Sequence, residues 1–230
     1  MTIINKDNYF FGEIYLPHAD SGISSEVKDV GVKIDDFIDE YVPDCLIKSL
    51  GSKLGHEFIG ELDDLEVNGL KSGADAKWDL LLNGETYDNP NGDEVVWKGI
   101  RFKSSSTSEY NKSLLAYYVY YFYESNDSIV RTGAGHARLE AANAIRVSAT
   151  HKSIKAWRKF ITMVQGTSFE NPYFQRNTIF GSITAVDYYK VNLSAGVSLY
   201  RFIEDKNELV ADTYADFVPW MWRQQNQLQM

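Results

Sequence analysis

The sequence has little of what marks secreted, membrane-spanning or catalytic proteins. Its one cysteine, Cys45, excludes an internal disulfide, so nothing indicates an oxidising compartment. None of the four histidines belongs to a nucleophile signature that would predict a catalytic triad. The most apolar run, residues 114–123, is about half the roughly 20 residues that a membrane helix needs. Residues 1–10 lack the pattern of a signal peptide, so a cytosolic origin is expected.

The sequence is instead rich in apolar, aromatic and acidic residues. The 44% apolar content and the net charge of -9 are typical of a folded globular chain, and 15 Tyr and 5 Trp favour large contact areas. Residues 1–98 carry 21 Asp and Glu against 8 Lys and Arg (-13), whereas residues 99–230 carry 11 against 15 (+4), which sums to -9. This asymmetry suits a subunit whose one side meets the opposite side of its neighbour. Uneven surface composition is the alternative.

The expected fold is mainly α, with a helical bundle core, an extended N-terminal arm and a C-terminal β and loop extension. Residues 1–32 are predicted to form the arm, because a strand-like run at 9–16 is followed by Pro17. Residues 33–166 are predicted to form the helical core domain. Residues 167–230 are predicted to form the extension, which ends in an aromatic anchor.

Within the core, apolar residues recur at helical spacing in several segments. The first segment starts at Ile34, is expected to kink or restart at Pro43, and should end at Gly51. The other predicted helices cover residues 54–62, 72–83, 108–125 and 136–165, and the tyrosine-rich third of these should be enclosed by its neighbours. Residues 85–99 are predicted to be loop and hairpin, and residues 182–200 alternating strands.

No residue pattern carries a specific chemical signature. His136 and Glu140 have a spacing that two metal ligands can use, but no second histidine lies nearby. The acidic cluster at 63–66 lacks the alternating ligands and glycine of a calcium-binding loop. We therefore assign no catalytic, cofactor-binding or metal-ligating residue, expect no cofactor, and expect that the protein is not an enzyme.

The candidate functional residues are suited to protein contacts. The helix predicted at 136–165 carries a stripe of basic residues that could bind nucleic acid. A pI near 5.0 for the whole chain instead favours pairing of this stripe with the acidic segment 1–98 of another subunit. The terminal aromatic segment can dock on its own core or on a neighbouring subunit, since both bury the same residues. The interface candidates are Tyr9, Phe10, Phe11, Tyr15, Arg146, Lys155, Arg158, Lys159, Trp220 and Trp222.

One series of motifs resembles a known family. The series is Lys77-Trp78-Asp79-Leu80-Leu81-Leu82-Asn83-Gly84, then Gly92, Trp97-Lys98-Gly99, the aromatic run 114–123 and Thr132-Gly133. It resembles the head-to-tail connector (adaptor, ring or neck) proteins of tailed bacteriophages, as in crAss-like and other phages of gut Bacteroidetes. The likeness covers roughly residues 30–165.

The resemblance implies a ring of many copies beneath the portal, with twelvefold symmetry as the family expectation, around a channel for genomic DNA. The implied partners are other copies of the chain, the portal protein, other neck and tail ring proteins, and DNA that passes non-specifically; no membrane is implied. The implied location is the virion neck, after assembly in the host cytoplasm. Asp63, Asp64 and Glu66 are candidates for lining the channel, because acidic walls do not hold phosphates.

Two alternatives remain open from the sequence. One is another phage neck or tail-completion protein. The other is a cytosolic helical ligand-binding domain or enzyme whose tyrosine-rich helix lines a pocket.

Overall fold

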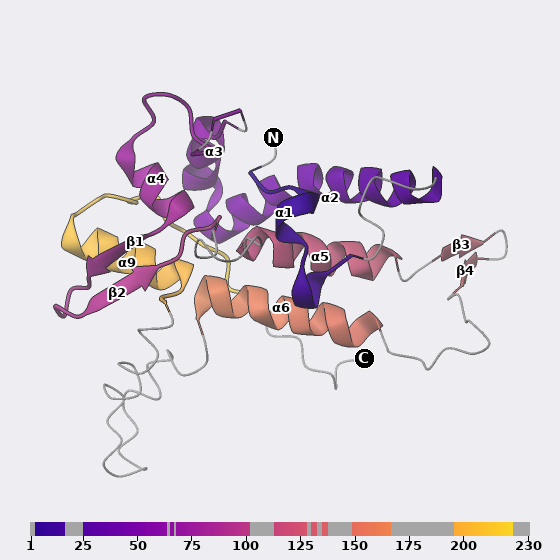
Figure 1. The fold of residues 1–230 in the computed structure, drawn as a ribbon. Coiled ribbons are helices and arrows are strands. Elements are labelled where there is room, and N and C mark those ends of the chain that lie inside the picture. The colour runs from indigo at the N-terminus through magenta and orange to yellow at the C-terminus, as the bar shows by residue number, and fades with distance from the viewer. Residues whose placement is uncertain are drawn as a thin grey trace, which may run out of the picture.

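The computed structural model of the chain describes residues 3–16, 25–63, 65–66, 68–101, 113–127, 130–132, 135–137, 149–166 and 196–222, with side chains described except at 25–33 and 126–150 (Figure 1). The helices are α1 (Lys6–Tyr9), the 3-10 helix η1 (Gly12–Ile14), α2 (Ser25–Leu50), α3 (Ser52–Glu61), α4 (Ala76–Asn83), α5 (Leu114–Asp127), α6 (Ala149–Gln165) and α9 (Leu199–Leu209). Two antiparallel hairpins pair β1 (Glu85–Asp88) with β2 (Glu94–Trp97), and β3 (Val130–Thr132) with β4 (Gly135–Ala137). The mainly α prediction is confirmed.

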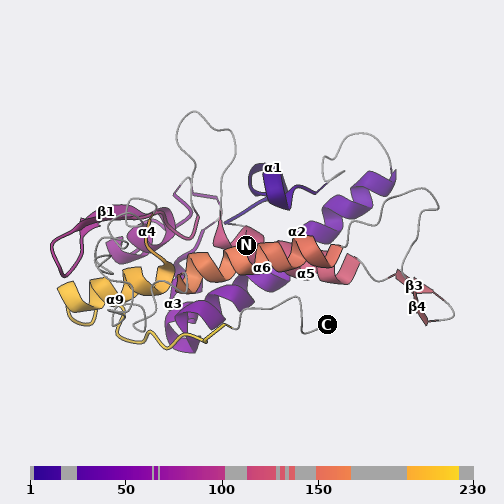
Figure 2. The same cartoon turned by 90° about the horizontal axis from the view of Figure 1, so that it is seen from below.

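The tyrosine-rich helix α5 lies at the centre of the core. It contacts α2 on one side and α6 on the other; Figure 1 shows it between these two helices, and Figure 2, seen from below, shows α6 in front of it. Every residue from Leu114 to Tyr120 is buried, because this run is apolar on all sides of the helix. The prediction that this helix is enclosed is confirmed.

The helix α2 runs through Pro43 without restarting, contrary to one of the two expectations for that residue. Its predicted end is confirmed, since Gly51 follows its last residue and donates its N–H to the carbonyl of Ile47 at 2.9 Å. The predicted short helix after it is α3, and the helix predicted at 72–83 is α4, capped by the Asp75 side chain.

The first hairpin forms where turn residues follow one another in the sequence. The Oδ1 atom of Asn89 accepts from the backbone N–H of Asn91 and of Asp93, both at 2.9 Å. The strands then pair from Asp88 opposite Glu94 to Glu85 opposite Trp97. The predicted hairpin is confirmed.

The expected strand at residues 9–16 is wrong. Asn5 accepts from the N–H of Asn8 at 2.9 Å and starts α1, and η1 follows after one turn. A lone strand would leave its backbone groups unpaired, whereas helical turns satisfy them locally. The segment packs on the core, and its buried side chains are Ile3, Ile4, Tyr9, Phe10, Ile14 and Leu16.

Two predictions for the second half of the chain need correction. The long helix starts at Ala149 in the described residues, and His136 lies in β4 rather than in a helix; residues 138–148 are outside the described residues. Of the strands expected at 182–200, residues 182–195 are outside the described residues, and the last two belong to α9. A helix forms there because Ser198 caps it and Leu199, Phe202 and Ile203 are buried on one face.

Candidate assembly surfaces

Three of the five tyrosines of α5 form hydrogen bonds to carboxylates within the chain. Burial raises the pKa of each of these phenols, and each hydroxyl donates to a carboxylate. The pairs are Tyr117 with Glu13 (2.6 Å), Tyr118 with Asp44 (2.6 Å) and Tyr120 with Glu124 (2.8 Å). These bonds satisfy the polar ends of a buried helix, which gives the tyrosines a structural role.

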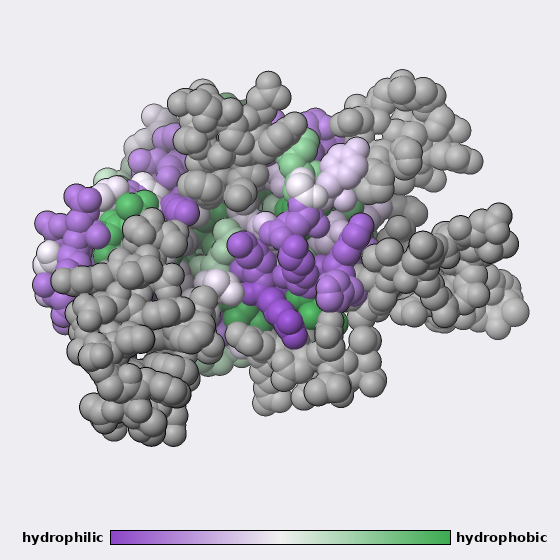
Figure 3. Space-filling model, turned by 60° about the horizontal axis from the view of Figure 1, so that its bottom comes forward, coloured by the Kyte–Doolittle hydropathy of each residue, from purple (hydrophilic) through white to green (hydrophobic). Residues whose placement is uncertain are grey.

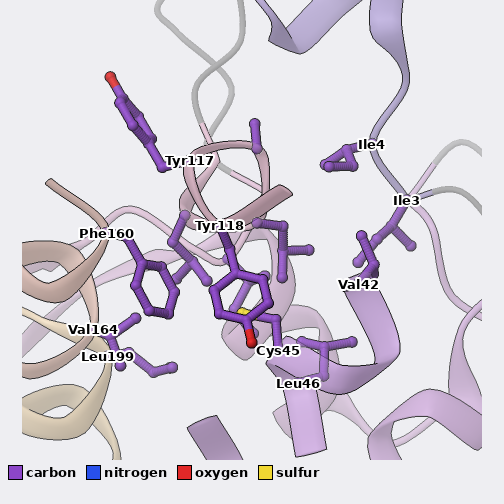
Figure 4. Close-up of a cluster of buried hydrophobic side chains, with 14 of the residues drawn as sticks. Ile3, Ile4, Val42, Cys45, Leu46, Tyr117, Tyr118, Phe160, Val164 and Leu199 are labelled. Atoms are coloured by element: carbon purple, nitrogen blue, oxygen red, sulfur yellow. The ribbon is translucent and has the colours of Figure 1, made fainter. Parts of the chain in front are cut away.

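Aromatic rings fill the space beside α5 where the ligand-binding alternative would need a pocket. The ring centroid of Tyr118 lies 4.9 Å from that of Phe160 and 5.6 Å from that of Trp222. Figure 4 shows the Tyr118 ring directed toward Cys45 and Leu46, whereas Tyr117 points to another side of α5. Cys45 is fully buried, as expected for a core residue, and burial raises the pKa of its thiol.

A buried polar cluster connects α9 to the first hairpin through hydrogen bonds and ion pairs. This cluster was not predicted from the sequence. Asp205 is 1% exposed, accepts from the Tyr87 hydroxyl at 2.9 Å and lies 2.8 Å from Nε of Arg201. Burial raises the pKa of the Asp205 carboxyl, against the charge of Arg201. Lys206 pairs with Glu85 at 2.7 Å beside it. The i, i+4 spacing of Arg201 and Asp205 was the available signal.

The residues of this cluster are not arranged to bind a metal ion. In the part of the chain that the structure describes, no group of three or more His, Cys, Asp or Glu residues is placed to hold a metal ion. The Tyr87 hydroxyl instead donates to one carboxylate oxygen of Asp205, and the guanidinium of Arg201 forms an ion pair with the other.

Two of the four N-terminal interface candidates are core residues. Tyr9 and Phe10 are 5% and 2% exposed, so their assignment as contact residues for a partner is wrong. Burial raises the pKa of Tyr9 to about 12, which the charge of Arg101 partly offsets. Phe11 is half-buried and Tyr15 is half-exposed, so these two remain on the surface.

The C-terminal strap (residues 217–222) docks on the end of α2. The N–H of Val218 donates to the carbonyl of Leu50 at 3.3 Å, and that of Trp220 donates to the carbonyl of Lys48 at 2.9 Å. These are carbonyls that the end of a helix leaves without an internal partner. The indole N–H of Trp222 donates to the Tyr200 hydroxyl at 3.1 Å, and its ring packs in the core. Trp222 therefore anchors the strap on its own core.

The same strap presents an apolar ridge to solvent. Val218, Trp220 and Met221 form this apolar ridge, with 72%, 62% and 79% of each residue exposed. The Tyr200 hydroxyl donates to the carbonyl of Trp220 at 2.6 Å, so the backbone of the ridge is held from both sides. Trp220 stays an interface candidate, and its two neighbours are added by the structure.

The outer side of α6 is a basic face, as the sequence predicted. The helix has no Asp or Glu, and Figure 3 shows hydrophilic side chains gathered over it. Lys155 pairs with Glu13 at 3.1 Å, and the hydrogen bond from Tyr117, with the charge of Lys155, lowers the pKa of Glu13. Arg146 lies outside the described residues. The exposed residues of the basic face are His151, Lys152, Lys155, Arg158 and Lys159.

Asp63 and Glu66, two of the three acidic residues proposed for a DNA channel, lie in an acidic turn after α3. Oδ1 of Asp63 accepts from the N–H of Leu65 at 3.0 Å, and the N–H of Asp63 donates to the carbonyl of Gly69 at 3.0 Å. Glu66 is exposed, and Asp64 is outside the described residues. The acidic turn therefore presents the side chain of Glu66 to solvent.

Across the described ranges, no helix has both the length and the apolar character needed to cross a bilayer. Comparison of the chain with protein-family models, with curated proteins and with solved structures gave no match.

Proposed function

We propose that this protein is a structural subunit of a head-to-tail connector ring in a tailed bacteriophage, where it joins the portal to the tail around the DNA channel. The observation that carries the proposal is the apolar ridge. Three large apolar side chains are exposed on a segment whose backbone is already fixed by hydrogen bonds to α2 and to Tyr200. Contiguous apolar residues on a surface mark sites of protein contact.

A fixed backbone makes such a ridge effective in assembly. Docking a segment that is already ordered avoids much of the conformational entropy that a flexible tail would lose. Burying each apolar side chain at a subunit contact contributes about 1.5–3 kcal/mol. The ridge thus supplies affinity without any chemical step, as a structural subunit requires.

Two of the motifs that carry the resemblance to connector proteins contact each other, which also supports the proposal. Trp78, Leu81 and Leu82 of α4 are buried, and the centroid of the Trp78 ring lies 5.4 Å from that of Phe58 in α3. The indole of Trp97 donates to the carbonyl of Leu81 at 3.1 Å. In this proposal the partners are other copies, the portal protein and further neck and tail proteins, and the location is the virion neck after assembly in the host cytoplasm.

Cryo-electron microscopy of native particles, with the mass of the purified chain measured with and without portal protein, tests the proposal. We expect a ring at the portal vertex and a multiple of the chain mass in the presence of portal protein. A chain that stays monomeric with portal protein, and is found outside particles with a small molecule retained, would overturn the proposal.

Truncating the apolar ridge is expected to weaken assembly without unfolding the chain. Trp220→Ala with Met221→Ala removes exposed side chains, so the melting temperature should stay nearly constant, while the dissociation constant of the assembly rises about 30-fold, or ~2 kcal/mol. Analytical ultracentrifugation measures the dissociation constant of the assembly, and thermal denaturation measures the melting temperature. Leu65→Ala is the matched control, since Leu65 is 91% exposed on another surface. Equal effects of the two changes would contradict the role of the ridge.

The acidic turn is proposed to line the channel, because like charges keep DNA phosphates from binding to the wall. Changing Asp63, Asp64 and Glu66 to Lys should leave rings intact and slow DNA ejection, most strongly at low salt, where screening is weakest. Fluorescent dye release from particles measures ejection. Asp63→Asn alone keeps the acceptor for Leu65 and serves as the control. Unchanged ejection in the triple variant would contradict the assignment.

A further inference from the structure

The outer side of α2 is acidic, and this surface was not among the sequence candidates. Ile34, Ile38 and Val42 are fully buried on the side of α2 that packs inward. Asp36 and Glu40 project from the opposite side, since residues two positions away on a helix are turned by about 200°. Both are exposed, as is Asp39. We refer to these three residues as the acidic α2 face.

The acidic α2 face and the basic α6 face lie on opposite sides of one layer of helices. α5 contacts both α2 and α6 and lies between them in Figure 1. Each outer helix turns its apolar side toward α5, so each charged face points away from it. A single copy therefore presents opposite charges in opposite directions and cannot pair the two faces with each other.

We infer that the basic α6 face of one copy docks on the acidic α2 face of the next copy. This inference rests on the proposed function, because it names the surfaces by which copies would meet in a ring. The contact is heterologous, so each copy uses one face on each neighbour, and the pattern repeats around a ring if the rotation closes. Opposite charges favour this orientation, and like charges disfavour both alternatives, in which identical faces meet.

A second copy fits both faces better than nucleic acid does. DNA would satisfy the basic α6 face alone and leave the acidic α2 face without a role, in a chain with a net charge of -9. Exposed ion pairs each contribute little to affinity, about 0.2–1 kcal/mol. Their role here is to set which sides meet and to speed encounter, while the apolar ridge adds affinity.

Charge reversal on each face, alone and together, tests the inference in the full-length chain. One variant carries Lys152→Glu and Lys159→Glu, and the other carries Asp36→Lys and Glu40→Lys. Each variant alone would bring like charges together, so we expect at least a tenfold loss of assembly with portal protein, measured by mass photometry. The chain that carries all four changes should assemble as the unchanged protein does.

Mixing the two variants provides the sharper result. The α6 variant has an acidic α6 face, which matches the basic α2 face of the α2 variant. The α2 variant keeps its basic α6 face, which matches the unchanged acidic α2 face of the α6 variant. An equal mixture should therefore restore rings in which the variants alternate, and native mass spectrometry should find them in equal numbers with an even total. Asp88→Lys with Glu94→Lys, two exposed acids on the first hairpin, is the matched control and should assemble normally.

The outcomes separate the inference from the function on which it rests. If the unchanged protein forms rings, and folded variants also form them singly, or fail to form them when mixed, the α6-to-α2 contact is wrong and the ring proposal stands. If the α6 variant loses DNA binding while its rings stay intact, the contact is likewise wrong. If the unchanged protein forms no ring with portal protein, the proposed function itself fails.

Discussion

Replacing Phe202 with alanine is expected to lower the free energy of unfolding by about 3–5 kcal/mol. Phe202 is fully buried, stacks on Trp97 with centroids 5.2 Å apart, and meets the ring of Tyr87 edge-on at 5.7 Å. Its removal leaves a cavity between α9 and the first hairpin that the two short strands cannot close. Urea denaturation followed by tryptophan fluorescence measures the change.

The control for Phe202 lies on the same helix. Leu209→Ala shortens a side chain that is 44% exposed, so it should cost well under half as much. If Phe202→Ala lowered the free energy of unfolding by less than about 1 kcal/mol, α9 would not pack on the hairpin as described, because a cavity the size of a phenylalanine ring destabilises a core by more than that.

Replacing Gly84 with alanine is expected to destabilise the protein by about 2–6 kcal/mol, the sum of two separate costs. Gly84 has a φ of +89°, which an L side chain adopts only with strain of about 1–3 kcal/mol. The added Cβ would also lie 2.6 Å from the carbonyl carbon of Lys98 and 2.8 Å from the nitrogen of Gly99. Those are backbone atoms, so relief requires the hairpin to move away from α4, at a further cost of about 1–3 kcal/mol.

Gly92→Ala separates these two costs. Gly92 also has a positive φ, +79°, but an added Cβ there meets no atom within 4 Å. The Gly92→Ala variant should therefore carry the backbone strain alone and lose about half as much stability, and thermal denaturation of both variants measures the two losses. Equal losses for the two changes would show that the close approach of Gly84 to the Lys98–Gly99 backbone has no energetic consequence.

Local patterns determined much of the fold from the sequence. The apolar spacing after Ile34, the cap at Asp75 and the turn residues after Asp88 each act within a few residues, and α2, α4 and the first hairpin follow from them. The basic side of α6 was readable for the same reason, since helical spacing alone separates its charged residues from Trp157 and Phe160.

Predictions that depended on distant contacts failed. Tyr9 and Phe10 looked available for a partner, but α2 and α5 offer an apolar surface that covers them in the same chain. Strands were expected at 182–200, yet residues 199 and 200 begin α9, whose Phe202 packs against Trp97 and Tyr87. Aromatic residues bury equally well in a core or at an interface, so their identity does not choose between the two.

By itself, the sequence determined most helices of the core, though not α1, η1 or α9, as well as the apolar side of those core helices and the unequal charge in the two halves of the chain. The tertiary structure alone decided that Trp222 is an anchor while Trp220 is exposed, and that the acidic α2 face and the basic α6 face point in opposite directions. The reason is that backbone hydrogen bonds and helical periodicity act over a few residues, whereas the direction of a face depends on which distant helix covers its other side.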